Sequence, residues 1–144
     1  MKAEYVTLLS EAEYEKYQSN IPRIKCWWWL KSSKQFDIDD NGEKVKCKFP
    51  DRINMLGFVD HNPIAIQDYV AGVRPVLKIS DHNYEIGSII GYGSNTWIYI
   101  GDDYLISDYI VLFCEYDVRN NIAWNESQLK TKLETLAKNR RWLK

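Results

Sequence analysis

The sequence has little that would crosslink or anchor the chain. Its three cysteines, Cys26, Cys47 and Cys114, are odd in number and widely spaced, which excludes the disulfide framework of a small secreted protein. The most apolar run, residues 26–30, is far too short to cross a bilayer. The first ten residues carry no apolar stretch of signal-peptide length, and Glu4 interrupts what there is. We therefore expect a cytoplasmic protein with reduced, mostly buried thiols and no membrane contact.

An excess of charge of one sign is also missing. Lys and Arg number 19 and Asp and Glu 20, so the formal net charge is -1. A dedicated nucleic-acid binder usually carries a basic excess, and this balance argues against one. The chain has 144 residues, of which 45% are hydrophobic and 27% charged, which is sufficient for a folded core. We expect one compact domain over residues 1–144.

Residues for metal, cofactor or acid–base chemistry are few. The two histidines, His61 and His82, each stand beside an aspartate, but no motif places a serine or cysteine near them, so a catalytic triad cannot be argued. The cysteines and histidines do not have metal-ligand spacing. Gly87, Gly91 and Gly93 lie among strands rather than in a phosphate-binding loop before a helix. The sequence predicts no catalytic residue, no metal site and no cofactor.

One stretch of alternating polar residues, Asp37-x-Asp39-x-Asn41-Gly42, matches the first half of a calcium-binding loop. The position where such a loop carries a bidentate Glu is Lys48, and the flanking residues alternate as in strands. Asn-Gly is a strong hairpin signal because both central residues of a type I′ turn need positive φ. We predict a hairpin turn here, with calcium as the weaker alternative.

Hydrophobic periodicity predicts an α+β fold with two main helices and many short, mostly antiparallel strands. Residues 10–13 have the form of a capping box, so the first helix should cover about residues 11–20. Asn125 or Ser127 would cap the second, over about residues 126–138. We expect strands at residues 4–9, 27–31, 36–39, 44–49, 72–79, 85–92, 96–100, 104–107 and 109–115.

Several motifs together resemble a family of bacterial and phage domains of unknown function that has a Trp-Trp-Leu-Arg-Ser signature followed by Gly-Val-Arg-Pro. Residues 28–32 read Trp-Trp-Leu-Lys-Ser, and residues 72–75 read Gly-Val-Arg-Pro. Residues 96–100 resemble the family's opening strand, and residues 124–133 its Trp-x-x-Ser helix element. The resemblance implies a C-type-lectin-like fold, the scaffold of formylglycine-generating enzymes. It also implies structural roles for Trp28, Trp29, Arg74, Pro75, Trp97, Trp124 and Ser127.

The order of these motifs differs from that of the family. Residues 1–80 resemble the second part of the family domain and residues 85–137 the first, which implies a circular permutation. The alternative is a domain-swapped homodimer in which each half completes that of a neighbour. We expect Arg74 to be partly buried and to link loops by hydrogen bonds.

The abundant residues are aromatic: they make up 14% of the chain, with six Trp and ten Tyr. Charge is also uneven, since residues 129–144 contain six bases and one acid, and residues 101–117 five acids and no base. These segments would either orient a partner or form a solvated helix end beside an acidic sheet edge. The candidate partner-binding residues come from these two charged segments and from the tryptophans outside the shared motifs. They are Trp27, Lys138, Arg140, Arg141, Trp142, Asp102 and Asp103.

These features predict a small binding module without catalysis whose partner is a protein. The family's frequency in phage and mobile elements suggests an inhibitor of a host protein. Two alternatives stay open. One is a nucleic-acid-associated protein that uses the basic C-terminal helix and an exposed Trp, and the other is an enzyme on the formylglycine-generating scaffold.

Overall fold

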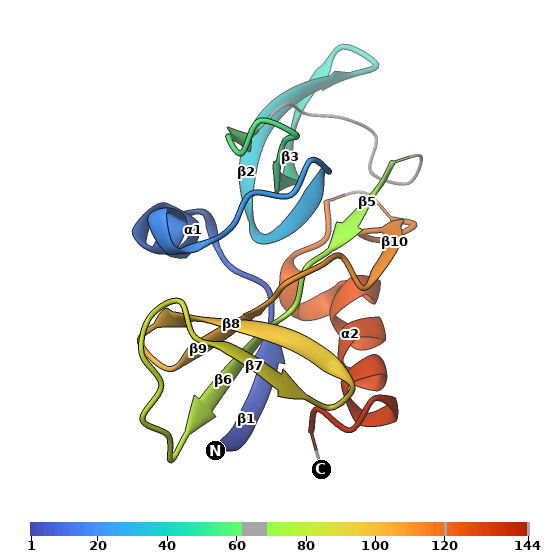
Figure 1. The fold of residues 1–144 in the computed structure, drawn as a ribbon. Helices are drawn as coiled ribbons and strands as arrows, with labels where there is room; N and C mark the ends of the chain where they lie inside the picture. Colours follow the sequence, from blue (N-terminus) through green and yellow to red (C-terminus); the bar gives the residue numbers. More distant parts are fainter. Residues whose placement is uncertain (62–68, 120, 144) are drawn as a thin grey trace.

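The strands of the protein form two five-stranded sheets in a computed structural model that describes residues 1–61, 69–119 and 121–143 (Figure 1). The first sheet has the order β1-β6-β9-β8-β7, with β1 (Lys2–Thr7), β6 (Val76–Ser80), β7 (Ile89–Tyr92), β8 (Asn95–Gly101) and β9 (Tyr104–Ser107). The second has the order β10-β5-β2-β3-β4, with β2 (Trp28–Asp40), β3 (Glu43–Ile53), β4 (Val59–Asp60), β5 (Val70–Val73) and β10 (Leu112–Glu115). The described pairings are antiparallel except for that of β2 with β5.

Two helices accompany the sheets, each beside a short 3-10 turn: α1 (Glu11–Tyr17) with Gln18–Asn20, and α2 (Gln128–Asn139) with Trp124–Glu126. The Ser10 side chain accepts the Glu13 N–H, and the Glu13 carboxylate accepts the Ser10 N–H, so the predicted capping box is present. Ser127 caps α2 by accepting the N–H of Lys130. The predicted α+β class, its two helices and its mostly antiparallel strands are confirmed. None of the helices in the described ranges is long and apolar enough to span a membrane.

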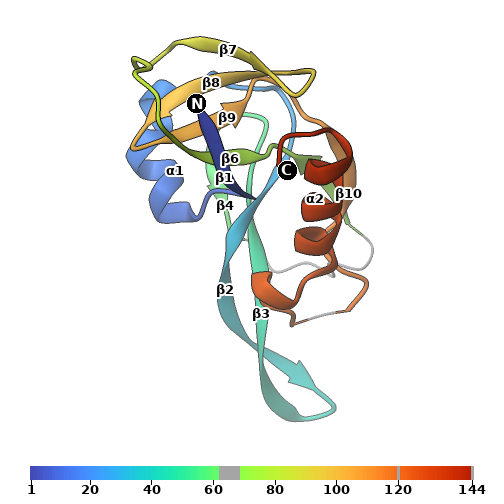
Figure 2. The same cartoon turned by 90° about the horizontal axis from the view of Figure 1, so that it is seen from below.

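The hairpin of β2 and β3 extends away from the rest of the molecule (Figure 2). Asn41 and Gly42 at its tip have φ of 52° and 83°, as the predicted type I′ turn requires. The expected strands 27–31 and 36–39 are one continuous strand, because a register shift after Trp29 lets pairing resume at Ser33. The intervening residues contain no Gly or Pro that would end a strand.

The predicted strand at 72–79 is wrong, because Arg74 and Pro75 separate two strands in different sheets. Pro75 has no N–H to donate to a ladder, and the chain passes there from β5 to β6. The Pro75 carbonyl still accepts the N–H of Ser107 at the end of β9. This crossing places Arg74 between the two sheets, where it is 1% exposed.

Most of the tryptophans belong to the core, since Trp28, Trp29, Trp97 and Trp142 are buried. The expectation that Trp142 faces a partner is therefore wrong. Its indole lies edge-on to Trp97, with ring centroids 5.0 Å apart, and its Nε1 donates to the Gly93 carbonyl. Arg141 has a φ of 60°, and the Trp142 N–H donates to the Ala137 carbonyl. This reversal after α2 turns the ring inward.

Candidate functional site

Three large apolar side chains are exposed on the turn between β3 and β4. Met55 is 50%, Leu56 64% and Phe58 63% exposed. The Asn54 side-chain oxygen accepts the N–H groups of Leu56 and Phe58 at 2.9 and 3.0 Å, and Gly57 adopts a φ of 88°, which favours glycine. These bonds order the backbone of the turn, and we call its three exposed apolar residues the apolar turn.

A cavity of about 130 Å³ opens beside this turn. Its walls come from α1, the segment that leads into β2, and the apolar turn itself. The apolar part of its lining includes Ile21, Ile24, Trp28, Ile53 and Leu56. Two arginines also line it, and none of its lining residues in the described part of the chain is acidic. We call this feature the arginine cavity.

Arg74 is the buried charge of the arginine cavity. Its Nε donates to the Ser107 carbonyl at 2.8 Å and its Nη1 to the Pro22 carbonyl at 2.9 Å. These bonds confirm the predicted link between loops, although the side chain is fully rather than partly buried. Nη2 has no hydrogen-bond partner among the residues that the structure describes. Burial lowers the pKa of Arg74 to about 10, against the opposing charge of Asp108, so the guanidinium stays protonated at neutral pH.

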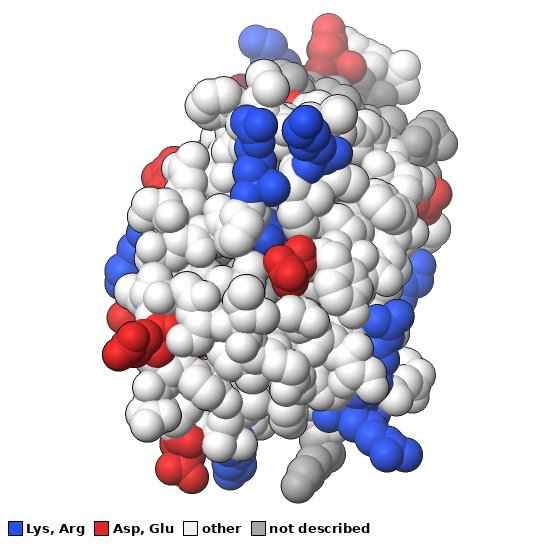
Figure 3. Space-filling view, viewed as in Figure 1, with Lys and Arg blue, Asp and Glu red and all other residues white. Residues whose placement is uncertain are grey.

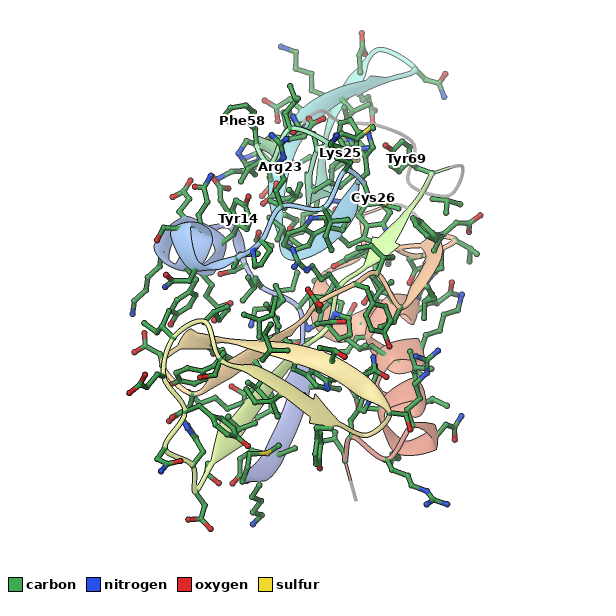
Figure 4. The ribbon with its side chains drawn as sticks, viewed as in Figure 1. Tyr14, Arg23, Lys25, Cys26, Phe58 and Tyr69 are labelled. Atoms are coloured by element: carbon green, nitrogen blue, oxygen red, sulfur yellow. The ribbon has the colours of Figure 1, made fainter. Side chains whose placement is uncertain are left out.

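Arg23 forms the rim between the cavity and the apolar turn. Its aliphatic stem packs across Gly57, and its Nη1 lies 3.5 Å from the Leu56 carbonyl. The hydroxyl of Tyr14 donates to the Gly57 carbonyl at 2.6 Å, which fixes α1 against the same turn. Figure 4 shows Tyr14, Arg23, Lys25 and Phe58 on this face. In the same view, Lys and Arg side chains gather above a broad area of mainly uncharged side chains (Figure 3).

The predicted acidic candidates form bonds within the chain. Asp102 accepts a hydrogen bond from Tyr17 and pairs with Lys16 at 2.8 Å. These two groups lower the pKa of its carboxyl. Asp103 pairs with His82 at 2.6 Å. Both aspartates have positive φ in the turn between β8 and β9. They therefore help to form this turn, in addition to carrying charge.

The predicted basic candidates lie at the end of α2. Lys138 and Arg141 are exposed, and Arg140 is partly exposed with its guanidinium 5.9 Å from the Trp142 ring. Trp27 is partly buried, because the Arg52 guanidinium stacks on its ring at 4.7 Å and Tyr69 packs edge-on against it. Neither tryptophan among the candidates is therefore fully exposed, because Trp142 is buried and Trp27 is partly covered. The basic candidates at the end of α2 do not form one surface with Trp27.

A cluster that no sequence motif predicts joins α1 to β3. His61 Nδ1 lies 2.7 Å from Asp51 Oδ1, and its Nε2 lies 3.2 Å from Glu11 Oε1. Ser32 donates to the other oxygen of Asp51 at 2.8 Å. Three potential metal ligands meet here, but each ring nitrogen of His61 already faces a carboxylate. The serine contacts the aspartate rather than the histidine, so this is not a nucleophile–base pair.

The cysteines are partly buried rather than mostly buried. Burial raises the pKa of the Cys26 thiol, and it is also the largest cause that raises that of Cys114. A raised pKa reduces the thiolate fraction at neutral pH, which makes both thiols poor nucleophiles.

Comparison with known proteins identifies no relative, so any functional conclusion depends on the geometry of the site. No family model matches the chain. No curated protein and no solved structure is significantly similar to it.

Proposed function

We propose that the protein is a non-catalytic, cytoplasmic binding module that recognises a partner protein through the apolar turn and the mouth of the arginine cavity. The single observation that carries the proposal is the exposure of Leu56 and Phe58 on a hydrogen-bonded turn beside a cavity that Arg23 and Arg74 line. A turn whose backbone is already hydrogen-bonded needs less ordering of its backbone on binding, which favours recognition.

The chemistry of this face favours a partner segment that combines acidic and large apolar side chains. Leu56 and Phe58 offer apolar contact, and Arg23 and Lys25 supply positive charge on the adjoining segment. Charge complementarity of this kind selects partners and speeds their encounter. Inhibition of a host protein is one form that such recognition takes, in keeping with the family resemblance.

We also propose the circularly permuted, C-type-lectin-like relationship. In support, β1 pairs with β6 of the same chain, and so lies in one sheet with β8 and β9. Met1 and Leu143 line one shared cavity, so the two ends of the chain lie close together, as a permutation needs. The single chain completes its own sheets without the exchange that the domain-swapped alternative requires.

Selection from a random peptide display library tests the proposed function. We expect the wild-type protein to enrich peptides in which Asp or Glu accompanies large apolar residues. Phe58→Asp should weaken binding of a selected peptide about 10- to 100-fold, the range of a residue at the centre of an interface.

Phe113→Asp is the matched control, because Phe113 is 59% exposed on β10, which lies outside this face. It should leave the affinity unchanged. Enrichment of basic peptides, or equal loss of affinity in both variants, would refute the proposal. In a separate titration, nucleic-acid binding that weakens steeply with salt would favour the basic end of α2 instead.

A further inference from the structure

We infer that the protein forms a weak, symmetric dimer in which the free edge of β7 pairs with β7 of a second copy. This inference goes beyond the proposed function and does not depend on it, because β7 belongs to the first sheet and the apolar turn joins strands of the second. Its basis is an edge strand without the usual protection against pairing, together with a glycine that the single chain does not require.

The two edges of the first sheet differ in how well they are protected. Among the described strands, β1 and β7 form these edges. β1 carries Lys2 and Glu4 and has a register shift after Ala3, and charged side chains and bulges usually prevent an edge strand from pairing. β7 reads Ile-Ile-Gly-Tyr, without charge, proline or register shift, and it lies at the margin of the molecule in Figure 2. Its outer edge is therefore open to a further strand.

The pairing of β7 with β8 determines which backbone groups of β7 point outward. The Ser88 carbonyl accepts the N–H of Tyr99 on β8. Residues that bond to the neighbouring strand alternate with residues that do not along an antiparallel ladder. The N–H and C=O groups of Ile89 and Gly91 therefore point away from β8, and no described backbone bond outside the strand ladders involves them. These groups are available to a further strand.

The side chains of β7 complement those of a second copy about a two-fold axis. Ile90 packs against the core, so Ile89 and Gly91 share the opposite face of the strand. With the axis at Ile90, antiparallel pairing places Ile89 of each copy opposite Gly91 of the other, and these residues exchange N–H···O=C bonds. Ile89, which is 71% exposed in the single chain, then covers the bare backbone of the glycine.

The single chain does not explain why residue 91 is a glycine. Gly91 has no positive φ, and a Cβ added there would meet no atom within 4 Å. A Cβ at Gly93, by contrast, would lie 2.5 Å from the Trp142 ring, so packing requires that glycine. Glycine weakens a strand and often marks the close approach of another backbone. A second copy of β7 supplies such a backbone.

Charges at the two ends of β7 favour a second copy over an unrelated strand. Glu85 is exposed in the turn that leads into β7. At the other end, Arg140 and Arg141 line a hollow with Ser94 at the tip of the β7–β8 hairpin, which lies beside the end of α2 in Figure 1. Antiparallel pairing brings the start of one β7 next to the end of the other, so the acid of each copy faces the bases of its neighbour. Such complementarity favours one partner and one register.

The dimer is weak because one short strand from each copy makes a small interface. Interfaces below about 1,200 Å² are typical of transient association, and we expect a dissociation constant on the order of 100 µM. At the low micromolar concentrations that suffice for urea unfolding, the chain is then a monomer in which Ile89 stays exposed.

Sedimentation equilibrium of the full chain between about 10 µM and 1 mM tests the inference. We expect the weight-average mass to rise with concentration from that of one chain toward that of two. Ile89→Lys places like charges near the axis and should weaken association about tenfold. Val70→Lys is the matched control, because Val70 is 54% exposed on β5 in the other sheet, and it should leave association unchanged. A monomeric mass at every concentration, or equal weakening by both variants, would overturn the inference.

A second pair of variants tests the contribution of charge. Glu85→Lys should weaken association about fivefold, as for the loss of two exposed ion pairs. Glu43→Lys, at an exposed residue of the distant β2–β3 hairpin, makes the same change of net charge and should have no effect. Equal weakening by both variants would show that net charge alone controls association, which contradicts the proposed pairing.

Nuclear magnetic resonance of a mixture of isotope-labelled and unlabelled chains establishes the register. Ile90 of each copy faces Ile90 of the other in a non-hydrogen-bonded pair, where the backbones are closest. We expect an intermolecular nuclear Overhauser effect between their α-protons. Intermolecular contacts at the apolar turn or β10 instead would overturn the inference. Failure of peptide selection would refute the proposed function and leave these results unchanged, so the two failures are distinguishable.

Discussion

Truncation of Trp142 gives the sharpest test of how the C-terminal residues pack. The side chain is fully buried, stacks edge-on against Trp97 at 5.0 Å and donates to the Gly93 carbonyl at 3.2 Å. Replacement of a buried aromatic residue by alanine costs about 3–5 kcal/mol, and an edge-to-face pair contributes about 0.5–1.5 kcal/mol beyond its area. We expect Trp142→Ala to reduce the free energy of unfolding by about 4 kcal/mol.

The assay is urea unfolding followed by far-ultraviolet circular dichroism. In a domain of 144 residues, a loss of this size lowers the melting temperature by about 12 °C. Ile89→Ala serves as the control, because Ile89 is 71% exposed and its truncation should change stability by less than about 0.5 kcal/mol. A loss below about 1 kcal/mol for Trp142→Ala would show that the ring lies on the surface and would restore Trp142 as a partner-binding candidate.

Two further predictions concern the residues that hold the start of α2. Ser127→Ala removes the side chain that accepts the Lys130 N–H and should cost about 1 kcal/mol in urea unfolding; an unchanged midpoint would show that the cap contributes nothing. Burial acts to raise the pKa of Asp117, but hydrogen bonds from Arg119 and Gln128 lower it on balance below its usual value of 3.8. Its contribution is therefore complete above about pH 4 and lost as the pH falls through the folded-state pKa. Asp117→Asn should be less stable than wild type at pH 7, and the difference should shrink as the pH falls below 3.8; a difference that stays the same as the pH falls would contradict this account.

Local signals in the sequence were sufficient for features that neighbouring residues decide. The capping box at Ser10 and Glu13, the Asn41-Gly42 turn and the Ser127 cap each depend on residues within a few positions. Their physical causes, backbone N–H groups that need acceptors and φ angles that suit few residues, act over short distances. Such features could be predicted without knowledge of the fold.

The candidate site could not be predicted, because its parts come from segments far apart in the chain. Tyr14, Arg23, Gly57 and Arg74 meet only once the two sheets are assembled. Arg74 was recognised as a structural residue, but the cavity beside it has no sequence motif. Trp142 was misassigned for a related reason: its inward direction depends on the chain reversal at Arg141 and on space beside Trp97.

A crystal structure of the protein with a selected acidic peptide tests the central claim most directly. The account predicts an acidic side chain of the peptide beside Arg23 at the mouth of the arginine cavity and an apolar side chain of the peptide against Leu56 and Phe58. A peptide bound on another surface, with the arginine cavity free of any peptide atom, would contradict it.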